Sequence, residues 1–137
     1  MTTTRRYSLS QAARHMKGVL LTATALLVIA WYNWPAGVPD VDARTARVLA
    51  SYAENWWQHR EAIRSIPRED WPSKVQRLAP QRIYVTNEGV FIQFGNFFVE
   101  SSGLFILPDG SDFQPQSGTD PSFQLLHHGV YKFEIKG

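Results

Sequence analysis

The most uniform feature of the hydropathy pattern is an apolar run at residues 18–34, GVLLTATALLVIAWYNW, which contains no charged side chain. As a helix it would be about 25 Å long, close to the roughly 30 Å of a bilayer's hydrocarbon core. Its aromatic rings gather at the C-terminal end, where rings of this kind favour the headgroup interface. The pattern predicts a transmembrane helix over 18–34, anchored by Gly18, Leu21, Leu27, Ile29, Trp31, Tyr32 and Trp34.

Two alternatives to a retained span use the same residues. A basic head followed by an apolar run also occurs in cleaved signal peptides, which end in a small-residue cleavage site. No such site follows this run, because Ala30 precedes aromatic residues and Ala36 has Trp34 two positions before it. A buried helix of a water-soluble protein would normally keep a polar stripe, and residues 18–30 have none. We therefore favour the retained anchor over both.

Four basic residues precede the run, and residues 1–17 carry no acid: Arg5, Arg6, Arg14 and Lys17. The positive-inside rule places this segment in the cytoplasm and residues 35–137 on the far side of the membrane. The short single-span layout is typical of a protein of the bacterial inner membrane. Pro35, Gly37 and Pro39 make residues 35–40 a stiff juxtamembrane linker, so residues 41–137 form the predicted extracytoplasmic domain.

Helical periodicity continues after the linker. Leu49, Ala53 and Trp56 recur at helical spacing, and the stripe extends through Tyr52 and Ile63. Asp40 or Asp42 is suited to cap the first turn, and Pro67 ends the pattern. The spacing predicts one amphipathic helix over residues 41–66.

From residue 81 the pattern becomes extended. Strands are predicted over residues 82–86, 90–100, 104–107 and 130–136, with a hairpin turn at 87–89 and another turn at 101–103. Residues 108–122 form a loop, and residues 123–126 are expected to pack it down. All eight phenylalanines lie between Phe91 and Phe133. The predicted fold is α+β: one transmembrane helix, then an amphipathic helix packed on a roughly four-stranded antiparallel sheet. The helix should cover a phenylalanine-rich face with Leu49, Tyr52 and Trp56 or Trp57.

Charge and composition narrow the function. The first 34 residues have four basic and no acidic side chains, a charge of +4, whereas the rest has ten basic against twelve acidic, a charge of −2. A nucleic-acid-binding domain would carry its basic residues on the folded part, so no nucleic-acid partner is expected. The chain has no cysteine, which excludes disulfides, thiolate catalysis and cysteine-ligated metals.

Candidate catalytic or metal-binding residues do not form a specific motif. The His127-His128 pair cannot easily share a metal on a strand, and the Asp109–Asp112 turn with Asp120 lacks the calcium-loop pattern. Serines occur without a G-x-S-x-G elbow. Paired carboxylates such as Glu88 and Glu100, or Ser/His in the sheet loops, leave an envelope hydrolase as the alternative. We predict no cofactor, no metal and no enzymatic activity.

The layout of a basic leader, an apolar helix, a second helix and an antiparallel sheet resembles that of type IV pilins and pseudopilins. Lys17-Gly18 before the apolar run is similar to their leader-peptide cleavage site. Ala23 and Val19 differ from the glutamate and phenylalanine usual in that family. A pilin-like subunit is therefore a lesser alternative.

The sequence predicts a single-pass, non-catalytic binding or accessory module at the outer face of the bacterial inner membrane. Its partners would be the lipid bilayer and a protein of the membrane or envelope. The expected interaction surface includes an exposed tryptophan, the turn-rich loop and a sheet edge. Its named residues are Trp57, Asp109, Asp112 and Phe113.

Overall fold

The computed structural model describes residues 37–59, 64–97 and 99–137. All of them belong to one compact unit, Pro35–Gly137. The predicted transmembrane helix and its basic flank lie outside the described residues. Within the described part of the chain, no helix is both long enough and apolar enough to cross a bilayer.

The main helix, α2, spans Ala43–Gln58 and begins at a local cap. The Asp42 carboxylate accepts a hydrogen bond of 2.7 Å from the Thr45 backbone N–H. The hydrogen bonds with Thr45 hold the pKa of Asp42 below its ordinary value. Residues 37–42 are not helical, so α2 begins at its own cap. The buried stripe of α2 consists of Ala46, Leu49, Ala53, Trp56 and Trp57.

The predicted end of this helix at residue 66 is wrong. The helix ends at Gln58, and Arg64–Ser65 form a short strand, β1, instead. Ile66 then points into the core, while its backbone N–H donates to the carbonyl of Ile83 at 2.9 Å. Pairing with the sheet therefore overrides the helical periodicity that includes Ile63.

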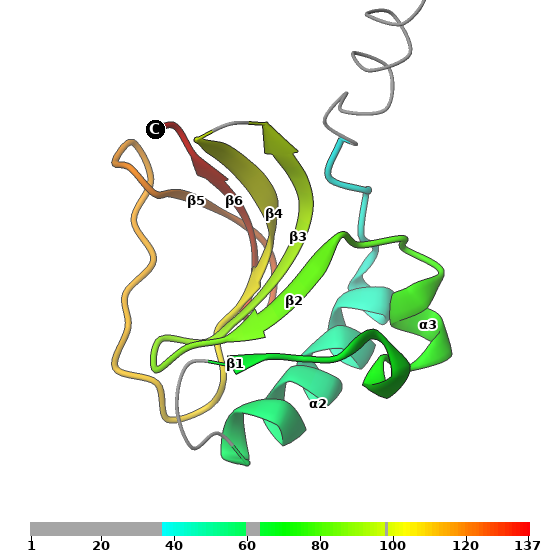
Figure 1. Ribbon diagram of the computed structural model, residues 1–137. Helices are drawn as coiled ribbons and strands as arrows, with labels where there is room; N and C mark the ends of the chain where they lie inside the picture. The colour runs from blue at the N-terminus through cyan, green and yellow to red at the C-terminus, as the bar shows by residue number, and fades with distance from the viewer. Residues whose placement is uncertain (1–36, 60–63, 98) are drawn as a thin grey trace, which may run out of the picture. The chain divides into compact units, whose positions relative to one another are not determined.

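The sheet is antiparallel throughout and has six strands in the order β1-β2-β3-β4-β6-β5 (Figure 1). A 3-10 turn, η1 (Arg68–Asp70), and a short helix, α3 (Ser73–Gln76), connect β1 to β2. The remaining strands are β2 (Arg82–Val85), β3 (Val90–Phe97), β4 (Glu100–Ile106), β5 (Ser122–His127) and β6 (Val130–Ile135). The α+β class is as predicted, with six strands where about four were expected.

The two additional strands are β1 and β5, which lie at the two edges of the sheet. From the sequence, the residues of β1 were predicted to be helical, and those of β5 were expected to pack the loop down. Neither is recognisable from local pattern, because β1 is two residues long and β5 lacks a regular alternation of buried and exposed positions.

The turn predicted at residues 101–103 is also wrong. Phe97 pairs with Glu100, so residues 98 and 99 connect β3 to β4, and residues 101–103 lie within β4. Gly103 is required by close packing: a side chain there would overlap the Ile92 carbonyl and the Phe133 ring.

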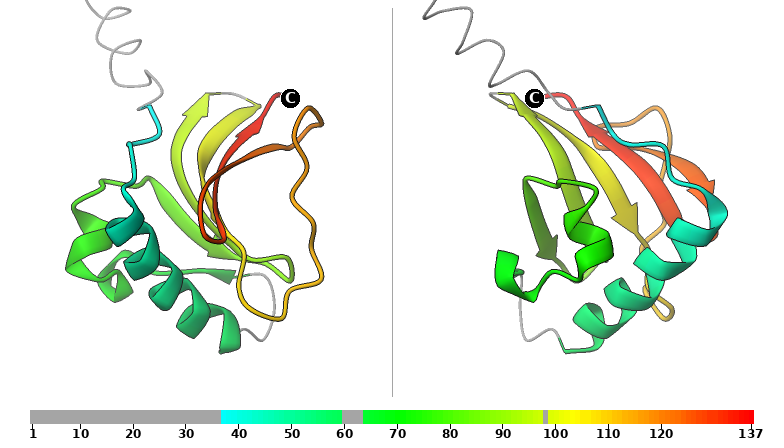
Figure 2. Two further views of the ribbon diagram at one scale, coloured as in Figure 1. Left: turned by 180° about the vertical axis from the view of Figure 1, so that it is seen from behind. Right: turned by 90° about the vertical axis from the view of Figure 1, so that its right-hand side faces the viewer.

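One face of the sheet, here named the aliphatic face, packs against α2. Its buried residues are Ile83, Val85, Val90, Ile92, Phe94, Leu104, Ile106 and Val130. Figure 1 and Figure 2 show α2 and α3 together on this side of the sheet. The prediction that the helix covers a phenylalanine-rich face is therefore wrong, since Phe94 is the one phenylalanine of the cluster under α2.

The opposite face, named the aromatic face, holds Phe91, Phe105, Phe123 and Phe133. Tyr84 stacks on Phe91 with ring centroids 4.9 Å apart, and burial raises the pKa of Tyr84. β3 and β4 are thus buried on both faces. The sequence of a strand that is buried on both sides is a nearly continuous apolar run. Because apolar and polar residues do not alternate in it, the sequence does not show which residues share a face.

An irregular segment, residues 108–121, crosses the aromatic face on the side opposite the helices (Figure 2) and is named the strap. Near the middle of the strap, the ring of Phe113 packs against two buried phenylalanines. Its centroid lies 5.4 Å from that of Phe105 and 5.5 Å from that of Phe123. Polar bonds hold it along its length: Asp109 N–H to Glu54 Oε2 at 3.1 Å, Ser111 Oγ to the Glu88 carbonyl at 2.7 Å, and Lys136 N–H to Asp120 Oδ1 at 3.0 Å. The strap is the cover of the second face.

Candidate binding surface at a sheet edge

The two edges of the sheet differ in length and chemistry. β1 offers two residues, and very short edge strands are one way in which proteins avoid unwanted pairing. β5 offers six residues, SFQLLH, which include no proline, lysine, arginine or carboxylate. The usual protections of an edge are therefore weaker at β5 than at β1.

Backbone geometry identifies the open part of β5. The Phe123 N–H donates to the Gln116 carbonyl of the strap at 2.8 Å, so it points away from β6. Because backbone directions alternate along a strand, the N–H and C=O of Leu125 point the same way. No backbone hydrogen bond within the described part of the chain engages them. The strap thus covers β5 at Phe123 and leaves it open at Leu125.

The Leu125 side chain adds apolar surface at this opening. It is 60% exposed, one of two large apolar side chains in residues 37–59, 64–96 and 99–137 that are this exposed. It shares the aromatic face with Phe123 and pairs with Tyr131 of β6. An extended segment lying along β5 would find two backbone groups to bond and a leucine to pack on.

The predicted interaction residues are placed differently from one another. Asp109 and Asp112 are exposed on the strap, as a turn-rich loop suggests. Phe113 is half-buried against the aromatic face, so its ring serves the fold. Trp57 is buried in the cluster beneath α2 and does not offer the exposed ring that the sequence analysis expected. Three of the four predicted interaction residues therefore lie on the strap, whereas Trp57 lies in the core on the opposite side of the sheet.

One cavity bears on the hydrolase alternative. A hollow of about 470 Å³ is lined by Ser51, Glu54, Asp109 and His128, among others. The Ser51 hydroxyl donates to the Val48 carbonyl at 2.8 Å, and Glu54 accepts from Gln58 Nε2 at 2.9 Å. No hydrogen bond in the described regions joins the His128 ring to Ser51 or Glu54. The hollow brings a hydroxyl, a carboxylate and an imidazole together without the nucleophile–base contact that acyl transfer needs.

Other candidate chemistry is separated by the fold. Glu88 lies in the turn before β3 and Glu100 follows its far end, so the length of the eight-residue strand parts them. They do not form the pair of carboxylates considered from the sequence. Across the described ranges, no group of three or more His, Asp or Glu side chains is placed to hold a metal ion.

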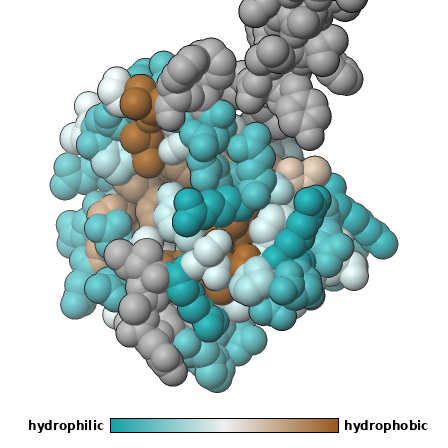
Figure 3. All heavy atoms as spheres, viewed as in Figure 1, coloured by the Kyte–Doolittle hydropathy of each residue, from teal (hydrophilic) through white to brown (hydrophobic). Residues whose placement is uncertain are grey.

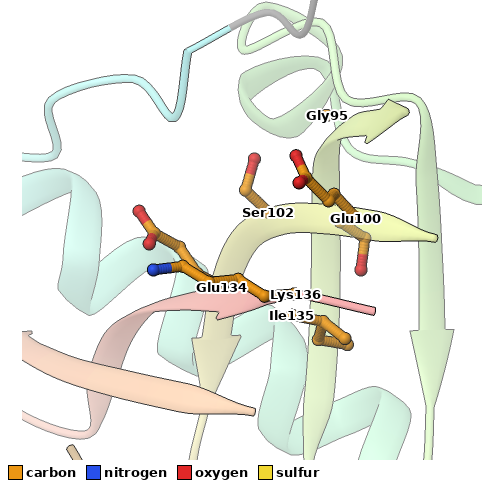
Figure 4. A pocket seen from close by; sticks show the side chains of 7 residues that line it. Gly95, Glu100, Ser102, Glu134, Ile135 and Lys136 are labelled. Atoms are coloured by element: carbon orange, nitrogen blue, oxygen red, sulfur yellow. The ribbon is translucent and has the colours of Figure 1, made fainter. Parts of the chain in front are cut away.

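A polar cleft of about 290 Å³ lies at the end of the sheet where β3 meets β4 (Figure 4). Glu100, Ser102 and Glu134 project from one side of the sheet, while Ile135 points to the other. Lys132 Nζ lies 3.0 Å from Glu134 Oε1, and the hydrogen bond from this lysine lowers the pKa of Glu134. This part of the helix-side surface lies beyond the aliphatic cluster and is polar.

Two exposed apolar side chains were missed in the sequence: Leu125, and Val99 between β3 and β4, which is 68% exposed. No local signal marks Val99, because residues 98 and 99 lack the Gly, Asn or Asp that a short hairpin connection usually carries. None marks Leu125 either, because its exposure follows from the position of β5 at the edge.

The chain matches no known protein-family model, no curated protein and no solved structure.

Proposed function

We propose that this protein is a membrane-anchored, non-catalytic binding module of the bacterial envelope, which holds an extended segment of a partner protein along β5. The observation that carries the proposal is the open backbone edge at Leu125 beside an exposed apolar side chain. Addition of a strand to an exposed edge is a general mode of peptide recognition.

The membrane attachment is supported by the sequence. Residues 18–34 combine an uncharged apolar run with interfacial aromatic residues, and basic residues precede them. The linker of residues 35–40 would keep the domain close to the bilayer. On this proposal, residues 1–17 are cytoplasmic and the domain acts at the outer face of the inner membrane.

The chemistry of the edge defines the partner segment. It would be extended, so that its backbone bonds the Leu125 N–H and C=O, and it would place an apolar side chain next to Leu125. β5 contains no Asp, Glu, Lys or Arg, so backbone bonds and apolar contact would provide the recognition. The exposed Asp109 and Asp112 on the strap would add a polar rim.

Site-specific photocrosslinking in intact membranes tests the proposal. A photoreactive residue at Gln124, exposed on β5, should give a discrete adduct with an envelope protein. The same probe at Lys74, exposed on α3, should not give that adduct. Identification of the adduct by mass spectrometry would name the partner.

Two matched variants examine the edge itself. With the probe at Gln124, Leu125→Lys should abolish the adduct, because a charged side chain protects an edge from pairing. Leu125→Val should retain it. Equal adducts from Gln124 and Lys74, or insensitivity to Leu125→Lys, would contradict the β5 edge as the site.

The anchor has an independent test. Full-length protein should stay in the membrane after carbonate extraction, and a C-terminal alkaline phosphatase fusion should be active in cells. Release by carbonate would contradict the anchor, and an inactive fusion would contradict the orientation.

A further inference from the structure

We infer that the β3–β4 tip is a second membrane contact, with Val99 seated in the headgroup region of the bilayer. This inference rests on the proposed membrane anchor and goes beyond it. The anchor fixes the location of the protein, whereas the tip would fix the orientation of its domain.

The composition of the tip is unusual for a hairpin. Phe97 pairs with Glu100, so the connection consists of residues 98 and 99, which are phenylalanine and valine in the sequence. Short hairpin connections favour Gly, Asn and Asp, because these residues adopt positive φ and stay hydrated. Val99 is 68% exposed, more than any other large apolar side chain in the described part of the chain. Such a tip does not serve the core.

The tip lies at the same end of the domain as the chain's entry. In Figure 1 and in both views of Figure 2, the start of the described chain near Gly37, the β3–β4 connection and the C-terminus lie at one end of the sheet. Gly137 lies against Val99, since a side chain there would overlap it. The β2–β3 turn, with Asn87 and Glu88, is at the other end of β3.

The length of the linker determines which end can reach the bilayer. Only residues 35 and 36 separate Trp34, the last residue of the apolar run, from Gly37. Three residue steps span at most about 10 Å. If residues 18–34 lie in the membrane, Gly37 is held at its surface, and the Val99 end of the domain is within reach of the headgroups. The Asn87 end is farther away by the length of β3, about 26 Å for eight residues.

The bilayer is the occupant favoured by this placement. Because the tether keeps the tip at a high local concentration of lipid, even a small apolar contact is populated. Figure 3 shows apolar surface at the end of the molecule where the C-terminus lies, among otherwise hydrophilic residues. Glu100 and Lys136 line the polar cleft beside the tip and carry opposite charges. The surface next to the tip therefore has mixed charge.

The absence of cysteine allows a direct test on the full-length chain in vesicles of phosphatidylethanolamine and phosphatidylglycerol. Val99→Cys, Asn87→Cys and Leu27→Cys are each labelled with a nitroxide, and collisions with oxygen and with a water-soluble nickel complex are compared by electron paramagnetic resonance. The Leu27 label should show lipid-like accessibility and the Asn87 label water-like accessibility. The Val99 label should lie between them, with a higher ratio of oxygen to nickel collisions than the Asn87 label.

The three positions separate the two ideas. A lipid-like Leu27 label with a Val99 label equal to the Asn87 label would overturn the tip contact and leave the anchor standing. A water-like Leu27 label would overturn the anchor and the inference together. Lipid contact at Asn87 equal to that at Val99 would show adsorption without orientation, and would also overturn the inference.

A second measurement removes any effect of a label at the tip. With the nitroxide at exposed Lys136, Val99→Asp should lower the ratio of oxygen to nickel collisions toward the value at Asn87, whereas Val99→Leu should preserve it. No difference between the two variants would count against Val99 as the contacting side chain.

Discussion

The two faces of the sheet are both apolar, yet they are covered in different ways. On the aliphatic face, α2 satisfies its own backbone hydrogen bonds and contributes a regular stripe of side chains. On the aromatic face, the strap has no regular structure and is held by a few side-chain bonds and Phe113. The comparison indicates that large aromatic rings can close a core under an irregular segment, because the rings fill the space themselves.

The difference also concerns function. A cover held by few bonds can open locally at a lower free energy than a packed helix. The strap is the element that contacts β5, through the Gln116 carbonyl and the Phe123 N–H. The side of the sheet with the irregular cover and the proposed binding edge are therefore neighbours, whereas the helix packs on the opposite side.

The largest expected effect tests whether the aromatic face is a true core. Phe105 is fully buried, and the centroid of its ring lies 4.7 Å from that of Phe91. Phe105→Ala should lower the free energy of unfolding by about 3–5 kcal/mol, the cost of lost burial plus a cavity. Urea unfolding of the full-length chain in detergent, followed by tryptophan fluorescence, measures it. A loss below about 1 kcal/mol would mean that the aromatic face contributes little, and Phe105→Leu should fall between.

Phe113→Ala examines the cover itself. The ring is half-buried, so we expect a smaller loss of stability, about 1–2 kcal/mol, from its reduced apolar contact. Hydrogen exchange should rise in residues 108–121 while α2 stays protected. If protection fell equally in α2, the strap and the helix would not open independently, and the proposed difference between the two covers would be wrong. Phe113→Leu should keep most of the protection.

Single hydrogen bonds at the two covers can be compared directly. Asp42→Ala removes the cap of α2, and Ser111→Ala removes the bond of the strap to the Glu88 carbonyl. Each should lower the midpoint of urea unfolding, and the loss for Ser111→Ala should be about 1 kcal/mol. Asp42→Asn should behave almost as the wild type, because asparagine also caps helices. Increased exchange in the strap after Asp42→Ala, with none in α2, would argue against the assignment.

The smallest effect concerns pH at the polar end of the sheet. The pKa of Glu134 is lowered by Lys132, so the pair stabilises the fold above the ordinary pKa of a glutamate. This stabilisation is lost as the pH falls through the lowered value. Both side chains are partly exposed, and solvent screening should keep the effect below about 1 kcal/mol. In an NMR titration, Lys132→Met should raise the pKa of Glu134; an unchanged value would contradict the pairing.

Local signals were sufficient for part of the fold. A helix start capped by Asp40 or Asp42 and the β2–β3 turn were predicted, because capping and turn chemistry act over three or four residues; the structure uses Asp42. The assignment of faces failed in β3 and β4, where both sides are buried. The edge strands β1 and β5 were missed because they are strands only by virtue of partners distant in the sequence.

The same distinction applies to the binding surface. Asp109 and Asp112 were correctly expected on an exposed loop, since turn residues favour solvent. The exposure of Leu125 and the burial of Trp57 depend on which element lies beside them.

The order of the strands has a consequence for how the domain is made. β6, at Val130–Ile135, lies between β4 and β5 and follows both in the chain. As the polypeptide is synthesised, β5 has no neighbouring strand until β6 has emerged beside it. Until then, the aromatic face lacks Phe133, and the edges of β4 and β5 are both open. A chain halted after β5 would leave β4 with one open edge and β5 with no partner at all, and such a chain is most exposed to aggregation and proteolysis in that interval.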